Sequence, residues 1–195
     1  MFCLVAIKVS AIEKIVLYGD SLMAGYGLNN EHQLSVVLQE KLIAKGYKLE
    51  VVNGSVSGST SSGGVNRVEW TLSESNINLV ILGLGANDML RGIQPKETKN
   101  NLEKIIKAAQ AKNIKVILAG MIAPTSYGFE YKNNFDQIYP DLSKQYNLPL
   151  IPFLLEGVAL KPKLNLRDGM HPNERGTIII SKTLQEMILK NILLN

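Results

Sequence analysis

The sequence predicts a three-layer α/β/α sandwich built on a five-stranded parallel sheet. Apolar, mostly β-branched runs alternate along the chain with segments whose apolar residues recur at helical spacing, and the connections are short. The runs are nearly continuous, which suits strands that helices cover on both faces. A chain of 195 residues with 46% hydrophobic content is long enough for one core and short for two. We therefore expect a single domain over residues 14–195, preceded by an N-terminal segment at residues 1–13.

Five strands and five helical segments are expected in strict alternation. The strands fall at 14–18, 49–52, 79–84, 115–119 and 148–153. Each helical segment places its apolar residues on one face. Those faces consist of Leu34, Val37, Leu38 and Leu42; Val65, Val68 and Leu72; Leu102, Ile105, Ile106 and Ala109; Phe135, Ile138, Tyr139 and Leu142; and Ile180, Leu184, Met187 and Ile188.

The composition excludes several classes of function. Lysine and arginine total 21 against 17 acidic residues, and the formal charge of +4 has no dense basic block, which argues against a nucleic-acid binder. The only cysteine is Cys3, so a disulfide within the chain is excluded and a thiolate zinc site is disfavoured. The only histidines are His32 and His171, so a mechanism that needs a histidine base has two candidates.

The N-terminal segment leaves two interpretations open. Residues 2–9 are apolar apart from Lys8, and Val9-Ser10-Ala11 resembles a small-residue cleavage site. A secretory leader would carry its positive charge ahead of the apolar stretch, so an ordinary N-terminal segment is the alternative. No other stretch approaches the length that crosses a bilayer, and we expect a soluble protein with no integral membrane segment.

Three of the expected strands end in polar or glycine-rich stretches, at 19–21, 53–60 and 85–88. The carboxyl ends of parallel strands share one edge of a sheet, where ligands bind. A nucleophilic serine there needs a base and donors that hold the developing oxyanion. Ser21 suits the nucleophile, a glycine in the second stretch allows close approach of a backbone N–H, and Asn87 offers a neutral amide. The plainer alternatives are a helix cap, a flexible loop and a turn pair, respectively.

The fourth polar stretch, 167–173, precedes the last helical segment. Pro172 suits the first turn of that helix, which would place His171 at its mouth. An acid three residues before a histidine, across a glycine-containing turn, can bind one ring nitrogen while the other faces the serine, so Asp168 is the candidate. A metal site would lack a third histidine or cysteine, and a capped helix start is the structural alternative. We expect His32, in a polar stretch, to lie on the solvated surface.

These four stretches resemble, in order and spacing, the four sequence blocks of the SGNH or GDSL hydrolases. The blocks are Gly19-Asp20-Ser21-Leu22, Gly58 within Ser57-Gly58-Ser59-Thr60, Gly85-Ala86-Asn87-Asp88, and Asp168-Gly169-Met170-His171-Pro172. More narrowly, the chain resembles the bacterial branch of arylesterases, acyl-thioesterase I and lysophospholipase L1. That similarity runs from about residue 14 to the end and includes 90–95, 124–128 and 138–140.

The resemblance implies a flavodoxin-like sheet, the SGNH hydrolase fold, with Ser21, Asp168 and His171 as a catalytic triad. It also implies an oxyanion hole made of the Ser21 N–H, the Gly58 N–H and the Asn87 amide, with no metal or cofactor. A periplasmic location follows if the N-terminal segment is a leader, and a cytoplasmic one if it is not. The chain departs from the branch at Ala86, where a glycine is common, and at Ser59, where an acid is common; both bear on substrate preference.

We therefore expect a serine esterase that cleaves carboxylic esters, and acyl thioesters or lysophospholipids, through an acyl-enzyme on Ser21. Its partner would be a small acyl substrate, with no nucleic acid, and a monomer is the expected state. Two alternatives stay open: a carbohydrate O-deacetylase of the same family, and a flavodoxin-like module that binds phosphate or flavin at the first strand's end. Asp20 argues against the second, because its carboxylate would repel a phosphate.

Two apolar loops at the same sheet edge can reach the acyl group of such a substrate. They span 89–95 and 121–131, after the third and fourth strands. The expected lining consists of Met89, Leu90, Ile93, Met121, Ile122, Tyr127 and Phe129. The alternative is that these residues cap the hydrophobic core.

Overall fold

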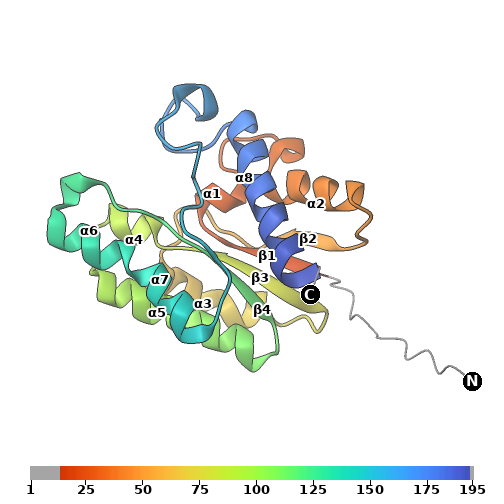
Figure 1. Ribbon diagram of the computed structural model, residues 1–195, viewed down its shortest axis with the longest axis horizontal. Helices are drawn as coiled ribbons and strands as arrows, with labels where there is room; N and C mark the ends of the chain where they lie inside the picture. Colours follow the sequence, from red (N-terminus) through yellow and green to blue (C-terminus); the bar gives the residue numbers. More distant parts are fainter. Residues whose placement is uncertain (1–13, 194–195) are drawn as a thin grey trace, which may run out of the picture.

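A five-stranded parallel sheet forms the centre of the computed structural model, which describes residues 14–193 (Figure 1). The strands are β1 (Lys14–Gly19), β2 (Glu50–Asn53), β3 (Ile77–Gly83), β4 (Lys115–Ala119) and β5 (Leu150–Ile151). Their order across the sheet is β2-β1-β3-β4-β5, and every neighbouring pair is parallel. The predicted fold class is confirmed. The possible leader within residues 1–13 lies outside the described residues.

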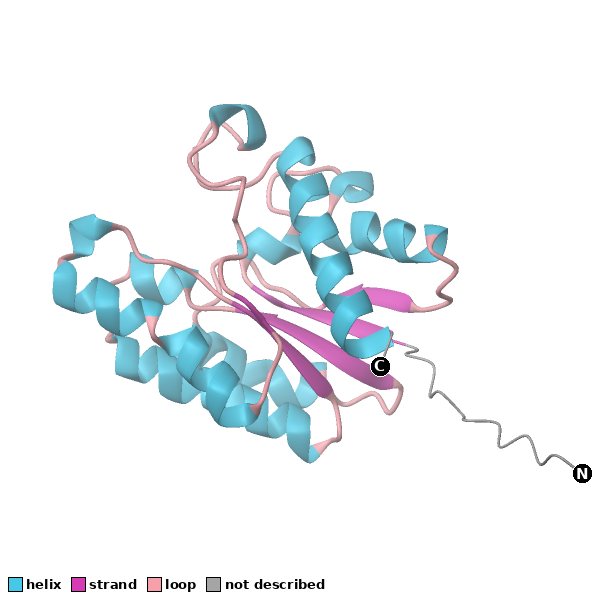
Figure 2. Ribbon diagram, in the orientation of Figure 1, coloured by secondary structure: helices cyan, strands magenta, loops and turns pink. Residues whose placement is uncertain are grey.

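Helices cover both faces of the sheet (Figure 2). On one face lie α2 (Leu34–Ala44) and α8 (Glu174–Ile188), which pack against each other. On the other lie α3 (Ser61–Thr71), α5 (Pro95–Ala111), α6 (Phe129–Asp136) and α7 (Ile138–Tyr146). This division follows from right-handed crossovers, because the chain moves outward from β1 to β2 and then in the opposite direction from β3 to β5.

Shorter elements lie mostly at the carboxyl edge of the sheet. Ser21–Ala24 form α1 and Ala86–Leu90 form α4, each directly after a central strand. The remaining short turns are η1 (Asn30–His32), η2 (Thr125–Tyr127), η3 (Pro162–Leu164) and η4 (Leu189–Leu193). The two central strands therefore end in helix starts, where a side chain and the backbone N–H groups of a first turn can face one ligand.

The fifth strand is much shorter than its apolar run predicts. The run spans 148–153, but only Leu150 and Ile151 pair with β4. Pro149 and Pro152 flank this pair, and proline has no N–H to donate to a ladder. The rest of the run, including Phe153, is released toward the carboxyl edge of the sheet.

The core lies between the sheet and both helix layers. All residues of β1 are buried, and so are all residues of β3 except Asn78. The apolar helix faces pack against them as expected, although Val37, Val65 and Met187 are only half-buried. The fourth expected helix is two helices, because the chain breaks at Gln137 between α6 and α7. Its aromatic residues still pack together, since Phe135 meets Tyr139 edge to face.

Candidate active site

Ser21 is held at the carboxyl end of β1 by a tight strand-to-helix turn. Asp20 is the N-cap of α1, and its Oδ1 accepts the N–H of Leu22 at 3.0 Å. Ser21 is therefore the first helical residue and not the cap, which leaves its hydroxyl available to other groups. At Gly19 a Cβ atom would lie 2.7 Å from the carbonyl oxygen of Gly83, so only glycine allows β1 and β3 to end this close together.

His171 and Asp168 reach this serine from the long loop between β5 and α8. His171 Nε2 lies 2.9 Å from Ser21 Oγ, and His171 Nδ1 lies 2.7 Å from Asp168 Oδ2. The other oxygen of Asp168 accepts the backbone N–H groups of His171 and Met170 at 3.0 and 2.9 Å. These hydrogen bonds, led by the backbone N–H of His171, lower the pKa of Asp168 to about 2. The carboxylate is therefore charged across the neutral pH range and fixes the imidazole ring.

The start of α8 differs from the sequence prediction. Pro172 was expected in the first helical turn, but α8 begins at Glu174 and Asn173 is its N-cap. The Asn173 side chain accepts the N–H groups of Arg175 and Gly176 at 3.0 and 3.1 Å. Pro172 lies before the helix and forms an isolated bridge with Asn165. His171 consequently belongs to a loop that is anchored on both sides, rather than to the helix mouth.

Gly58 and Asn87 approach the serine from two other loops. Gly58 has a φ of 78°, a conformation that favours glycine, in the loop after β2. Asn87 lies in α4, and its Nδ2 donates to the carbonyl oxygen of Ser59 at 3.2 Å. The guanidinium of Arg91 donates to the carbonyl oxygen of Gly58 at 3.1 Å. Two hydrogen bonds thus tie the glycine loop to the asparagine helix and fix the spacing between the two candidate donors.

The buried carboxyl group of Asp88 supports the segments that carry Gly58 and Asn87. Asp88 is fully buried, and its Oδ2 accepts the N–H of Ser61 at 2.8 Å. Its Oδ1 accepts the hydroxyl groups of Ser61 and, at 3.3 Å, Thr98. Ser61 begins α3 and Thr98 lies in the first turn of α5, so Asp88 joins the starts of three helices. The Asn87-Asp88 pair is therefore more than a turn, because the hydrogen bonds of Asp88 fix the helix starts that surround Asn87.

Asp20 has an unusual environment for a carboxyl group. Its side chain is almost fully buried, and its Oδ2 has no hydrogen-bond partner. Burial raises the pKa of Asp20 to about 6, against the lowering effects of the Leu22 N–H, the Asn87 amide and the His171 ring. The group directly before the candidate nucleophile thus titrates close to neutral pH.

The arginine at position 67 fixes the ends of the first two strands. Arg67 donates to the carbonyl oxygens of Gly19, at 2.9 Å, and of Gly54. Its guanidinium lies 3.9 Å from the centre of the Tyr18 ring, a cation–π contact. Ser55 adds a second link, because its hydroxyl accepts the Gly19 N–H and donates to the carbonyl oxygen of Leu17. These contacts make the carboxyl edge around Ser21 rigid.

A cavity of about 610 Å³ opens beside the candidate catalytic groups. Its polar lining includes Ser21, Gly58, Asn87 and His171. Most of the remaining lining is apolar: Leu22, Tyr26, Ala86, Met89, Leu90, Met121, Ile122, Ala123, Pro124, Phe153, Leu155, Ala159, Leu160 and Met170. Such a site suits a substrate with an apolar arm and a reactive polar group.

The structure places four of the seven residues expected to bind the acyl group in this cavity. Met89, Leu90, Met121 and Ile122 line it, whereas Ile93, Tyr127 and Phe129 do not. The Tyr127 ring stacks on Tyr131 at 5.3 Å, and the Tyr131 hydroxyl donates to the carbonyl oxygen of Ile93. The Phe129 side chain is 83% exposed at the start of α6. These three residues therefore belong to the packing and outer surface of the neighbouring α6 region.

The other side of the cavity comes from a loop that the sequence analysis missed. Phe153, Leu155, Ala159, Leu160 and Met170 all lie between β5 and α8. The signal was present in the apolar residues of 153–160, which precede the Asp168–His171 block, but the first of them, Phe153, was assigned to a strand. The ring of Tyr26, also missed, lies 4.5 Å from that of His171 and covers the imidazole.

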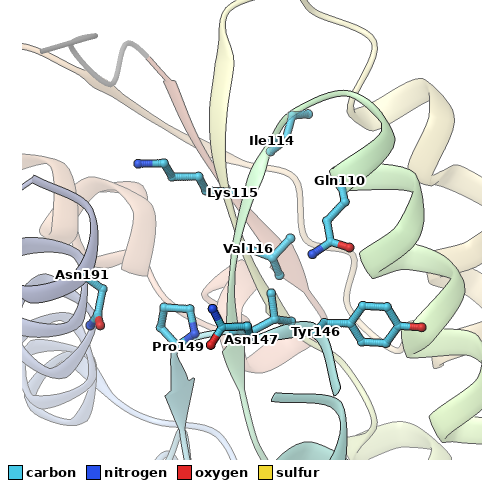
Figure 3. A pocket seen from close by; sticks show the side chains of 9 residues that line it. Gln110, Ile114, Lys115, Val116, Tyr146, Asn147, Pro149 and Asn191 are labelled. Atoms are coloured by element: carbon cyan, nitrogen blue, oxygen red, sulfur yellow. The ribbon is translucent and has the colours of Figure 1, made fainter. Parts of the chain in front are cut away.

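His32 and a second cavity lie apart from this cluster. The side chain of His32 is 38% exposed, and its Nε2 lies 3.5 Å from Glu174 Oε1. A cavity of about 540 Å³ lies at the amino ends of β4 and β5, opposite the edge that holds Ser21. Figure 3 shows the side chains around it, which include Lys115, Tyr146 and Asn191. None of the candidate catalytic residues borders it.

Within residues 14–193 no three His, Cys, Asp or Glu side chains are grouped so that they could hold a metal ion. Over the same residues no helix combines the length and the apolar character needed to span a membrane.

Comparisons with known proteins converge on one family. The model of the GDSL-like Lipase/Acylhydrolase family matches residues 17–177. An arylesterase from Vibrio mimicus is 36% identical over 191 residues, which cover 98% of this chain and 95% of the relative. Thioesterase 1/protease 1/lysophospholipase L1 from Escherichia coli K12 is 35% identical, with 95% and 89% covered.

Solved structures give the same result. The crystal structure of TesA matches with a TM-score of 0.85 at 34% identity and covers 90% of this chain and 98% of its own. The psychrotrophic esterase EstA from Pseudoalteromonas sp., in a form inhibited by monoethylphosphonate, matches with a TM-score of 0.87 at 33% identity. The match covers 94% of this chain and 100% of EstA.

Proposed function

Because the chain belongs to the GDSL-like Lipase/Acylhydrolase family, we propose that Ser21, His171 and Asp168 are the triad with which it hydrolyses carboxylic esters. The chain is a carboxylic ester and thioester hydrolase, as are its relatives named arylesterase and thioesterase. The hydrogen-bonded series from Ser21 Oγ through the His171 ring to Asp168 Oδ2, with links of 2.9 and 2.7 Å, carries the residue assignment.

In the proposed mechanism, His171 Nε2 takes the proton of the Ser21 hydroxyl while Oγ attacks the carbonyl carbon of the ester. Asp168 accepts the Nδ1–H and stabilises the imidazolium that forms. The tetrahedral intermediate then collapses, and His171 gives its proton to the departing alcohol or thiol. Water repeats the two steps on the acyl-enzyme and releases the acid, which restores the serine. The imidazole must be neutral at the start so that Nε2 can accept the serine proton.

The proposed oxyanion hole consists of the Ser21 N–H, the Gly58 N–H and Asn87 Nδ2. All three residues border the cavity that contains the serine hydroxyl. The Arg91–Gly58 and Asn87–Ser59 hydrogen bonds hold the two loops before substrate arrives. Donors that are fixed in advance need no reorganisation when negative charge develops on the carbonyl oxygen, which is why they accelerate acyl transfer.

We assign the apolar part of the cavity to the acyl chain of the substrate. Met121, Ile122 and Phe153 are among its lining residues. Each additional buried CH₂ contributes up to about 0.8 kcal/mol, or about fourfold in kcat/KM. We therefore expect medium-chain acyl esters, acyl thioesters and lysophospholipids to be better substrates than acetyl esters. A carbohydrate platform is disfavoured, since the only tryptophan, Trp70, lies on α3 and outside the cavity.

The deciding experiment combines a Ser21→Ala variant with a fluorophosphonate probe. The parent should be labelled at Ser21, and the variant should lose both the label and at least about 10⁴-fold in kcat. Ser57→Ala is the matched control, because Ser57 lines the same cavity and has no proposed part in the chemistry. The Ser57→Ala variant should keep both the fluorophosphonate label and the kcat of the parent. Labelling of a different serine, or a Ser21→Ala rate within tenfold of the parent, contradicts the proposal.

A further inference from the structure

Exposed apolar side chains gather around the mouth of the catalytic cavity. Among the described residues ten large hydrophobic side chains are exposed, and five of these line this cavity. The five are Tyr26, Leu90, Ile122, Leu160 and Met170. Single exposed hydrophobic residues need no explanation, but a group around one opening marks an interaction surface. We call these five residues the rim.

Leu160 is the most exposed of them and the most unusual. Its side chain is 93% exposed, although leucine is normally buried. Its φ is 61°, in the left-handed region, and the other two non-glycine residues with a positive φ within residues 14–193 are both asparagines. A bulky residue is strained in this conformation, and such strain persists chiefly where a function needs it. Here the fold holds an apolar side chain out in solvent at the entrance to a catalytic site.

Basic residues neighbour several rim residues along the chain. Lys161 follows Leu160, Arg91 follows Leu90, and Lys163 and Arg167 are exposed on the same loop as Leu160 and Met170. The acids of that loop are Glu156 and Asp168, and the second is bonded to His171. Figure 1 shows this loop, in darker blue, extending beyond the carboxyl edge of the sheet. Exposed apolar residues with basic neighbours are typical of protein surfaces that bind anionic lipid layers.

We propose that the rim docks on an anionic lipid surface, with Leu160 inserted among the acyl chains and the flanking lysines and arginines against the headgroups. An acyl ester could then pass from the lipid layer into the cavity without its chain crossing water. The identity of this cargo rests on the proposed function, whereas the docking itself does not. A second copy of the chain is the poorer occupant, because a two-fold interface would bring the two rims and their basic neighbours against each other.

The test measures binding of the Ser21→Ala variant, which cannot consume the lipid, to two kinds of vesicle. We expect flotation with vesicles of phosphatidylcholine mixed with phosphatidylglycerol, weak binding to pure phosphatidylcholine, and release by salt. Leu160→Asn should weaken binding at least about tenfold, the effect of withdrawing one leucine from an apolar layer. Asparagine tolerates a positive φ, so this variant should fold at least as well as the parent, which a melting curve checks.

Three further variants locate the docking face. Lys163→Gln should weaken binding about fivefold, as the loss of one cationic contact does. Trp70→Gln is the control: the side chain is 81% exposed, but α3 begins beside Asp88 and ends at Thr71, at the opposite edge of the sheet. Binding should not change. In the Trp70→Gln background, Leu160→Trp should shift its fluorescence to the blue on vesicles, whereas Trp70 in the parent should not.

Three results would overturn the docking proposal: equal binding to neutral and anionic vesicles, undiminished binding of Leu160→Asn, or a lipid-free dimer that Leu160→Asn dissociates. If the parent hydrolyses a water-soluble ester but ignores vesicles, the docking is wrong and the proposed function stands. If Ser21 is not labelled but the protein binds vesicles, the proposed function is wrong and the docking proposal stands.

Discussion

Replacement of Asp20 by asparagine should remove a pH dependence of stability that the fold builds in. The carboxyl group is 1% exposed, one of its oxygens accepts only the Leu22 N–H, and the other has no partner. Burial raises its pKa to about 6, whereas an aspartate in an unfolded chain has a pKa of about 3.9. The folded state therefore binds a proton that the unfolded state has already lost between about pH 4 and pH 6.

The sign and size of the effect follow from this difference in proton binding. Where the folded state holds more protons, the free energy of unfolding falls as pH rises. A difference of about two pKa units corresponds to about 3 kcal/mol, which is present below pH 4 and lost above pH 6. Asparagine keeps an oxygen for the Leu22 N–H and is an equally good N-cap, but it cannot ionise. The Asp20→Asn variant should lack this decline.

Urea unfolding followed by circular dichroism at several pH values between 4 and 7 measures the effect. The difference between the two unfolding free energies isolates Asp20, because all other titrating groups are common to both proteins. Glu130→Gln, at an exposed carboxylate, controls for removal of a charge. The variant should gain about 3 kcal/mol relative to the parent across the window. Parallel curves for parent and Asp20→Asn would refute the argument that burial governs this group.

Three further predictions test the site. Asn87→Ala should lower kcat by roughly 10² to 10³ with little change in KM for a soluble ester, since a lost oxyanion donor affects only the transition state; a raised KM alone would make Asn87 a binding residue. His171→Ala should be as damaging as loss of the nucleophile in the same assay, whereas His32→Ala should be nearly silent; the opposite pattern would exclude the triad. Asp88→Ala should lower the free energy of unfolding by about 3 kcal/mol or more, because the buried Ser61 N–H and hydroxyl lose their acceptor, and an unchanged urea midpoint would show that the contact is dispensable.

The sequence was sufficient for the layers of the fold because hydrophobic periodicity and burial have the same cause. The continuous run at 79–84 is a fully covered central strand, and the spaced residues Leu102, Ile105 and Ile106 are a buried helix face. Periodicity could not set the length of β5, since Pro149 and Pro152 have no N–H to donate while the apolar character of the run continues. The run continues as far as Phe153 for a different reason, because that residue lines the cavity.

The candidate site was predictable in its short motifs and not in its walls. Ser21, Asn87, Asp168 and His171 lie in stretches whose composition is unusual at the ends of strands, and the structure brings them together. The triad roles themselves stay a proposal. The position of the 153–170 loop depends on tertiary contacts that leave no periodic signal, such as Asn165 donating to the carbonyl oxygens of Val158 and Lys161. The sequence predicted acyl contacts for Ile93, Tyr127 and Phe129 because they lie near the site residues along the chain. Nearness along the chain does not determine where a side chain points.

The serine and the histidine that it meets are 150 residues apart along the chain. The histidine loop is held in place by α8, which packs on α2, where the Gln185 side chain donates to the carbonyl oxygen of Lys41 at 2.8 Å. During refolding the sheet can assemble while the proton acceptor is still absent, because contacts that close so long a loop carry a large entropic cost and form slowly. Ester hydrolysis should therefore recover only when the last helix has docked. Recovery of ester hydrolysis would therefore mark the end of refolding. The circular dichroism signal would instead report the secondary structure that forms at its beginning.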